Sequence, residues 1–285
     1  MNKVLYLALF LLLVLPVLTP SAFSLNSAQT LTLDTPSKDA AISSGGSMDV
    51  NDGAAYRLDF GFDNYSDITY RLLVQFDLPS TLSGEDIASV TLKLWGPTPW
   101  SSGYPSGEAL RACRVTHDWV EGTGESSAPT QDGVTWNEYN YSDGLNTNAN
   151  NWGTPGGDYT LEDSSTVIIP SYPMTWSHLN ITVTNIVKGW ASSAYPNFGF
   201  LIKLENESGA YKGGVFDSRE YGEFYGVQTL LELEITYGTS ATDVATNIVP
   251  PEFFYAAAVI GIAVIAVVVI SMFKKQKKRE EKTAS

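Results

Sequence analysis

The sequence is poor in the residue types that usually carry catalysis, metal binding or disulfide bonds. Its 285 residues include one cysteine, Cys113, and two histidines, His117 and His178. A single cysteine excludes an intrachain disulfide, and neither histidine belongs to an H-E-x-x-H motif or to another closely spaced metal-binding pair. No G-x-S-x-G motif is present. We therefore expect a protein that is not an enzyme, with Cys113 in the core and both histidines in structural or surface positions.

Basic residues are also scarce. The chain has 17 lysine and arginine residues against 31 aspartate and glutamate residues, which gives a formal net charge of −14. Lys3 contributes +1 and the residues after Phe273 contribute +4, so residues 25–252 carry −19. Nucleic-acid binding needs a basic surface, and this charge argues against a nucleic-acid partner. An acidic surface favours solubility and can bind cations.

Long apolar runs mark the two ends of the chain. At the N-terminus, Lys3 precedes a short apolar run that prolines interrupt, followed by the small-residue site Ala22-Phe23-Ser24. This pattern is typical of a secretory signal peptide, and we expect residues 1–24 to be removed by cleavage after Ser24. A first transmembrane helix is the alternative, but the run is shorter than the ~20 residues that a span needs.

The second apolar run predicts a membrane anchor. Residues 253–273 are 21 uncharged residues, which at ~1.5 Å per residue cross a ~30 Å hydrocarbon core. The basic residues in 274–285 predict a cytoplasmic tail, and hence a single-pass cell-membrane protein with an extracellular ectodomain at 25–237 and a stalk at 238–252. Pro251-Glu252-Phe253 also resembles a prokaryotic P-E-F sorting signal, after which a lipid would replace the tail.

Between the two ends, short apolar or alternating runs are separated by glycine, proline, asparagine, aspartate and serine. Such a pattern predicts an all-β fold, either an antiparallel sandwich or a barrel. We expect strands at 56–60, 70–76, 87–95, 109–116, 166–169, 177–183, 198–204, 214–217 and 228–237.

Two further segments differ from this strand pattern. Residues 184–190 have apolar residues at helical spacing after a possible cap at Thr184, and they predict a helix at one end of the sandwich. Residues 121–165 read as a long polar insertion, and loops of that length are usually functional or flexible.

Seven motifs follow one another along this region: R-L-L-V-Q-F-D-L at 71–78, I-A-S-V-T-L-K-L at 87–94, W-V-E-G-T-G at 119–124, G-V-T-W-N at 133–137, W-G-T-P-G-G-D-Y at 152–159, I-T-V-T-N-I-V-K-G-W at 181–190 and F-D-S-R-E at 216–220. Their order and spacing resemble the DNRLRE domain, also called the disaggregatase-related domain or carbohydrate-binding module family 96. The resemblance covers roughly 39–237. It implies a jelly-roll β-sandwich without catalytic activity, of a kind found beside polysaccharide-degrading enzymes or in archaeal and bacterial surface proteins.

Aromatic side chains in loops are the best candidates for sugar binding, because ring faces stack on the C–H faces of sugars. Trp100 and Tyr104 lie in a Gly/Pro/Ser loop, and Trp152 lies in the long insertion. Arg219 could pair with the carboxylate of a uronate, although a salt bridge to Glu220 or another acid is the alternative. Trp119, Trp136 and Trp190 are expected to be packing residues.

The acidic residues suggest calcium sites and the sequons suggest glycosylation. Calcium needs several oxygen ligands, and Asp49, Asn51 and Asp52 cluster in one expected turn. Asp158, Glu162 and Asp163 form a second cluster, and solvated turns are the alternative for both. Four N-x-S/T sequons, typical of an exported glycoprotein, occur at Asn64, Asn140, Asn180 and Asn206.

These features favour a non-catalytic cell-surface module that binds polysaccharide or envelope glycan. A structural or adhesive surface protein, associated with an S-layer and acting through protein contacts, is the first alternative. A glycan-cleaving enzyme is the second, because carboxylates are abundant and the separation that glycoside hydrolysis requires is a distance in space.

Overall fold

The computed structural model describes residues 28–47, 49–100, 103–125, 132–141, 150–171, 178–227 and 230–238. All of them belong to one compact unit, Asn26–Gly238. The expected signal peptide, transmembrane helix and basic tail lie outside the described residues, as does the expected stalk apart from Gly238. No helix among the described residues has both the length and the hydrophobicity that a membrane span requires.

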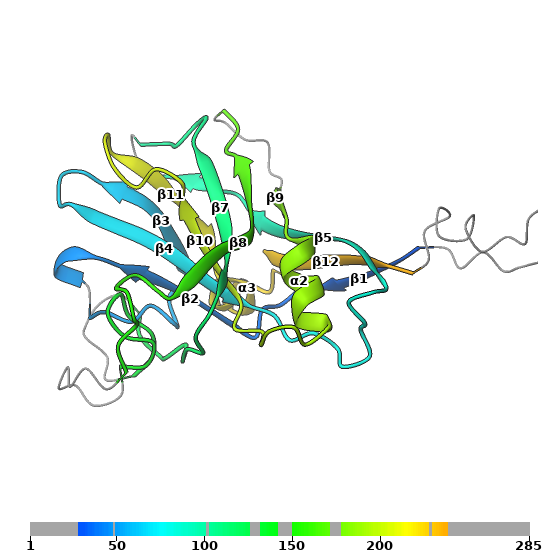
Figure 1. Cartoon of the computed structure of the whole chain (residues 1–285). Helices are drawn as coiled ribbons and strands as arrows, with labels where there is room; N and C mark the ends of the chain where they lie inside the picture. The colour runs from blue at the N-terminus through cyan, green and yellow to red at the C-terminus, as the bar shows by residue number, and fades with distance from the viewer. Residues whose placement is uncertain are drawn as a thin grey trace, which may run out of the picture. The chain divides into compact units, whose positions relative to one another are not determined.

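The unit is built from two antiparallel sheets (Figure 1). The smaller sheet has the strand order β1 (Gln29–Leu33), β12 (Leu231–Tyr237), β5 (Ile87–Trp95) and β9 (His178–Thr182). The larger sheet has the order β6 (Thr98–Pro99), β11 (Lys212–Asp217), β3 (Arg57–Asp63), β4 (Ile68–Gln75), β10 (Phe200–Leu204), β7 (Ala109–Val115) and β8 (Tyr159–Ile168), and β2 (Lys38–Ser43) also pairs with β4. One apolar core contains residues of both sheets, so the prediction of an all-β sandwich is confirmed.

Alternation along the strands decides which side chains enter the core. In β5, Val90, Leu92 and Leu94 are fully buried, whereas Lys93 lies on the opposite face. The Lys93 Nζ lies 2.5 Å from a carboxylate oxygen of Glu234 on the neighbouring β12. β5 and β12 are therefore half-buried strands with one polar face, as the sequence predicted.

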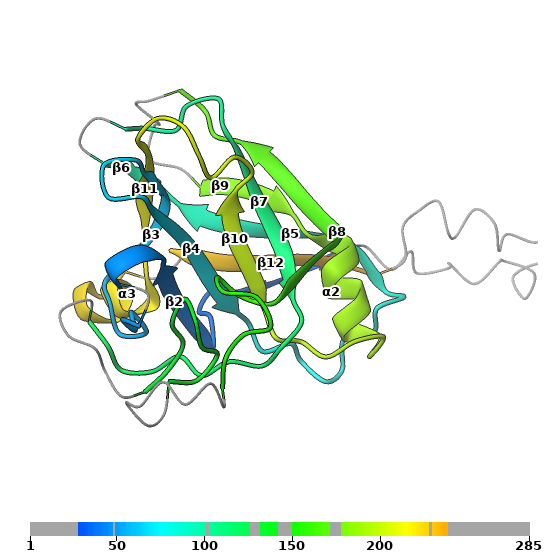
Figure 2. The same cartoon turned by 60° about the vertical axis from the view of Figure 1, so that its left-hand side comes forward.

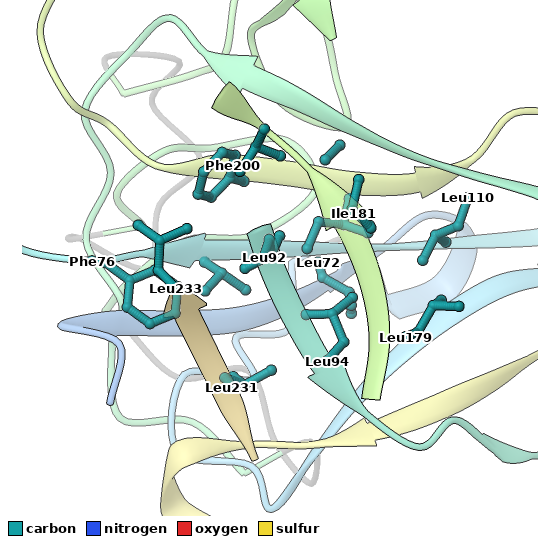
Figure 3. Packing of buried hydrophobic residues seen from close by; sticks show 14 of the residues in the cluster. Leu72, Phe76, Leu92, Leu94, Leu110, Leu179, Ile181, Phe200, Leu231 and Leu233 are labelled. Atoms are coloured by element: carbon teal, nitrogen blue, oxygen red, sulfur yellow. The ribbon is translucent and has the colours of Figure 1, made fainter. Parts of the chain in front are cut away.

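The core between the sheets consists of aliphatic and phenylalanine side chains (Figure 3). Leu72 and Phe200 come from the larger sheet, and Leu92 and Leu233 come from the smaller one. Burial of apolar surface contributes about 25 cal/mol per Å², so a core of this kind can stabilise a domain that has no disulfide bond.

Helix α2 (Thr184–Ala191) confirms the predicted helix. It packs against β5 and β8, one strand from each sheet (Figure 1). Ile186, Val187 and Trp190 form its buried face, and the ring centroids of Trp190 and Phe200 are 4.7 Å apart. The helix thus adds its apolar face to the main core.

The predicted cap at Thr184 is wrong. The N-cap residue is Val183, which makes no side-chain capping bond, and Thr184 is the first helical residue. The Thr184 Oγ1 instead accepts a hydrogen bond from the Val90 N–H of β5 at 2.9 Å. The side chain therefore joins the helix to the smaller sheet, a role that depends on tertiary contacts.

The described part of the segment between β7 and β8 lies beside β2 and β4 of the larger sheet (Figure 2). It contributes Trp119, Val134 and Trp152 to a second apolar cluster on the outer face of that sheet. The members of this cluster are Ala40, Ile42, Leu73, Val115, Trp119, Val134, Trp152 and Leu201. The prediction of a polar insertion over 121–165 needs correction, because 159–165 belong to β8 and because the described part of the loop packs on the sheet.

Candidate functional site

Four aromatic side chains lie together on the surface beside β3, β4 and β11. We call Tyr65, Tyr70, Trp100 and Tyr211 the aromatic platform. The ring centroid of Trp100 is 5.3 Å from that of Tyr211 and 5.2 Å from that of Tyr70. The ring centroid of Tyr65 is 5.6 Å from that of Tyr211, and Tyr65 is 83% exposed. The four rings thus form one connected, partly open aromatic surface.

Backbone pairing brings these rings together from distant parts of the chain. Tyr65 lies in the turn between β3 and β4, where its N–H donates to the Asp63 carboxylate at 2.9 Å. Trp100 follows β6, and Tyr211 directly precedes β11, with which β6 pairs. The Trp100 ring lies over Gly213, where a Cβ would be 2.5 Å from the ring. Glycine at 213 is therefore needed for the tryptophan to lie against the sheet.

Carboxylates border the platform. The Trp100 Nε1–H donates to an Asp59 carboxylate oxygen at 2.7 Å. Burial raises the pKa of Asp59, the hydrogen bond from Trp100 opposes that shift, and the negative charge of Asp52 adds to it. Burial, together with the charges of Asp59 and Asp63, also raises the pKa of Tyr70. The platform is therefore an acidic surface as well as an aromatic one.

A hollow of about 290 Å³ adjoins the platform at Asp59. Its lining residues are Ala54, Ala55, Tyr56, Arg57, Asp59 and Glu125. Ligand pockets usually begin at about 300 Å³, so the hollow lies just below that range. Because Asp59 lines the hollow and also accepts the hydrogen bond from Trp100, a ligand lying on the rings could extend into the hollow.

An arrangement of this kind suits carbohydrate. Tyrosine and tryptophan supply large rigid contact area with a polar tip, and carboxylate oxygens accept hydrogen bonds from hydroxyl groups. Trp100, the predicted sugar-binding residue that belongs to the platform, is held in place by its bond to Asp59. Tyr104 instead packs half-buried against the main core.

The structure corrects the expectation for Trp152. Its side chain is 4% exposed, and its Nε1–H donates to the Thr135 carbonyl at 3.0 Å. The ring belongs to the second apolar cluster. A buried ring has no open face for a sugar, so Trp152 is a packing residue.

Arg219 lies in a cluster of its own with three carboxylates. We call Arg219, Asp39, Glu121 and Glu220 the arginine–carboxylate cluster. The Arg219 Nη2 donates to Glu121 at 2.9 Å and to Glu220 at 2.7 Å, and its Nε donates to Glu220 at 3.1 Å. Its Nη1 donates to the Ser37 carbonyl at 2.9 Å. All three guanidinium nitrogens thus have acceptors within the chain, and Arg219 forms the salt bridge to Glu220 that was the alternative to uronate binding.

Asp39 is the buried member of this cluster. Its side chain is 1% exposed, and one carboxylate oxygen, Oδ2, accepts a hydrogen bond from the Arg219 backbone N–H at 3.0 Å. Burial and the negative charge of Glu220 raise the pKa of Asp39 to about 8, and the Arg219 interactions oppose that rise. The folded protein therefore holds a proton at Asp39 under conditions in which the unfolded chain would lose it.

This proton predicts a pH dependence of stability. The folded pKa is about 8 and the ordinary value is 3.8, so the folded state binds the extra proton between these values. The stability that this group contributes is present below pH ~4 and falls as pH rises to ~8, by at most ~1.4 kcal/mol per pH unit. Urea unfolding in EDTA should show this loss for the native chain and a smaller one for Asp39→Asn. Equal pH dependence of the two proteins would contradict the prediction.

The expected calcium turn needs correction as well. Asn51 is fully buried, and its Oδ1 accepts hydrogen bonds from the Gly53 N–H at 3.2 Å and the Gly124 N–H at 2.8 Å. Its Nδ2 donates to the carbonyls of Glu121 and Val134. The side-chain amide of Asn51 therefore makes all of its hydrogen bonds within the chain, mostly to the segment after β7, and has no free lone pair for a cation.

The other two members of that turn have different surroundings. Asp49 accepts a hydrogen bond from the Asn137 side chain at 3.1 Å, and the Asp52 charge acts on Asp59 beside the platform. In the second expected calcium cluster, Asp158 accepts hydrogen bonds from the N–H groups of Gly153 and Thr154. That carboxylate therefore closes a turn.

The remaining predicted residues lie as follows. Cys113 is fully buried, as predicted, and burial raises the pKa of its thiol to about 11. The ring centroids of His117 and Tyr139 are 4.0 Å apart, and those of His178 and Trp95 are 5.0 Å apart. Among the sequon residues, Asn64, Asn180 and Asn206 are exposed and Asn140 is half-buried.

The fold and the platform define a class: a β-sandwich that presents an acidic aromatic surface. Neither a scan against protein-family models nor a search of curated proteins finds a match for the chain. The sequence reasoning missed Tyr65, Tyr70, Tyr211 and Asp59. The signal for Tyr65 was present, because an exposed tyrosine in an Asp-Asn-Tyr-Ser turn has no packing reason to be there.

Proposed function

We propose that this protein is a non-catalytic cell-surface module that binds polysaccharide through the aromatic platform. The observation that carries the proposal is the connected set of four rings beside Asp59, with Trp100 at its centre. Exposed aromatic surface on a soluble domain usually marks an interaction site. Stacking on these rings and hydrogen bonds to the carboxylates would together bind a sugar.

The charge of the site guides the choice of glycan. Asp52, Asp59 and Asp63 all lie close enough to affect the titration of Tyr70. An anionic sugar would have to approach these charges, whereas a neutral sugar could donate its hydroxyl hydrogens to them. We therefore expect neutral polysaccharides to bind better than uronate-containing ones.

The finer assignments are part of the same proposal. We propose that the sandwich is a jelly roll of the DNRLRE type, that residues 253–273 anchor it in the cell membrane and that the domain lies outside the cell. The motif resemblance supports the family. Two glycines of those motifs, Gly122 and Gly133, are needed for packing, because a Cβ at either position would collide with Asn51. The apolar run and the basic tail support the anchor and its orientation.

A polysaccharide panel tests this function. The purified full chain, in mild detergent, is incubated with insoluble cellulose, chitin, xylan and mannan and with soluble acidic and neutral glycans on a sensor surface. We expect retention on at least one neutral polysaccharide above the level seen with a glycan-free surface. Retention on none of the panel would reject glycan binding.

A structural or adhesive role through protein contacts is the second candidate, and one observation favours it. Helix α3 (Arg219–Tyr225) exposes Phe224 to 65% and Tyr225 to 57%, and the Phe224 ring contacts the exposed Tyr56. Crosslinking on intact cells, followed by mass spectrometry, would support this role if neighbouring proteins were joined through α3. Crosslinks confined to other surfaces would count against it.

A further inference from the structure

The arginine–carboxylate cluster brings together three segments that are far apart in the sequence. Asp39 lies in β2, Glu121 follows β7, and Glu220 is the second residue of α3. One carboxylate oxygen from each of the three lies within 4.8 Å of the others. Among the residues that the structure describes, this is the one group of three His, Cys, Asp or Glu side chains with ligand atoms this close.

The cluster is not electrically balanced. Three carboxylates face one guanidinium, so with all groups ionised the cluster has a charge of −2. Glu223 also approaches Arg219, with 3.7 Å between its carboxylate and the Arg219 Nε, but its side chain is 68% exposed and solvent screens it. Burying unbalanced charge is costly, and the raised pKa of Asp39 is one consequence of that cost.

One atom of the cluster has no hydrogen-bond partner within the described residues. The Asp39 Oδ1 is buried and accepts no hydrogen bond, although the other oxygen of the same carboxylate is bonded to the Arg219 N–H. Buried polar atoms almost always have partners, and each exception needs an explanation. An unpartnered, fully buried oxygen beside two further carboxylates is what a cation-binding site offers when it is empty.

We propose that Asp39, Glu121 and Glu220 bind a divalent cation, and that the cation is calcium. The ligand set contains only oxygen, which suits the hard cations and not zinc or copper. With all three carboxylates ionised, a charge of +2 would neutralise the cluster, so calcium would displace the proton that Asp39 holds in the empty site, while Arg219 keeps its own bonds. The Glu121 and Glu220 side chains are 19% and 16% exposed, so the cation can enter from their side and complete its coordination with water.

Calcium bound at the arginine–carboxylate cluster would stabilise the folded sandwich. The cation would join β2, the segment after β7 and the start of α3, none of which is linked to another by a covalent bridge. A ligand that binds only the folded state raises the free energy of unfolding, and above Kd this rise grows with the logarithm of the ratio of ligand concentration to Kd. For a domain of about 200 residues we expect a rise in Tm of about 3–5 °C at ten times Kd.

Thermal unfolding and isothermal titration calorimetry of the full chain test the site, with CaCl₂ as the probe. The chain is first treated with EDTA and dialysed into chelator-free buffer at pH 7.5. We expect saturable binding of one calcium per chain and a Tm that rises with CaCl₂. Asp39→Asn and Glu220→Gln should each weaken binding at least tenfold, and MgCl₂ should replace calcium poorly.

Glu223→Gln is the matched control, because Glu223 also approaches Arg219 but lies outside the group of three. It should bind calcium as the native chain does. Absence of both heat and Tm shift for the native chain would overturn the proposal. So would equal loss of calcium binding in Glu223→Gln and Glu220→Gln, since that result would indicate diffuse attraction by an acidic surface. Asparagine mimics a protonated aspartate, so Asp39→Asn should fold, and Glu220→Gln provides an independent reading.

Discussion

Replacing Arg219 with alanine is expected to lower the free energy of unfolding by about 3–5 kcal/mol. Removing one partner of a buried ion pair has a cost of that order, because the other charge is left without compensation. Here Glu121 and Glu220 would lose their guanidinium donor, and Asp39 would lose the attraction of the positive charge while keeping its bond from the residue 219 backbone N–H. The Ser37 carbonyl would lose its donor too. Urea unfolding of the full chain in EDTA, followed by tryptophan fluorescence, measures the change.

Arg111→Ala is the matched control for this prediction. The Arg111 side chain is 22% exposed, close to the 18% of Arg219, and it also pairs with a glutamate, Glu205. Glu205 is 50% exposed, so solvent can compensate it, and the substitution should cost only about 0–1 kcal/mol. If the two substitutions had the same cost, the arginine–carboxylate cluster would not hold the three segments together as we describe.

Trp100→Ala is expected to weaken polysaccharide binding by about 10- to 100-fold. Central aromatic anchors of an interface typically contribute about 1.4–3 kcal/mol, which corresponds to that range of Kd. The substitution removes the ring that contacts both Tyr70 and Tyr211. It also leaves Asp59 without its donor. Binding to the best polysaccharide of the panel, titrated by biolayer interferometry, measures the loss.

Two controls separate recognition from folding. Trp95→Ala removes another half-buried tryptophan, from the smaller sheet, and should leave binding unchanged. Trp100→Phe keeps an aromatic face but not the Nε1–H, and should retain more affinity than Trp100→Ala. Equal binding by native chain and Trp100→Ala, with native Tm in both, would show that the platform is not the binding surface.

Alternation made most of the strands predictable. The alternating residues Val90, Leu92 and Leu94 indicate β5, because one face of that strand packs on the core and the other faces water. The residues of β2, Lys38–Ser43, give no such signal, because nearly all of them are buried between two apolar clusters. The sequence K-D-A-A-I-S has neither alternation nor high β-propensity, so β2 follows from its pairing with β4 rather than from its own residues.

The candidate site could be predicted only in part. A tryptophan in a Gly/Pro/Ser loop indicates Trp100, but the sequence does not indicate which residues will surround it. Tyr70 lies in β4 and Tyr211 directly precedes β11, and the pairing of both strands with β3 brings these distant residues together. Trp152 also lies in a polar loop, but its side chain is buried. It packs in an apolar cluster whose other members are spread along the chain, so the composition of the loop does not indicate the burial.

The position of a bound oligosaccharide tests the central claim most directly. Crystals of the chain would be soaked with an oligosaccharide of the best-binding polysaccharide, and the sugar located in the electron density. The account predicts a sugar ring stacked over Trp100 and Tyr211, with a hydroxyl directed at the Asp59 carboxylate. A well-ordered sugar bound on another surface, with the platform bare, would contradict it.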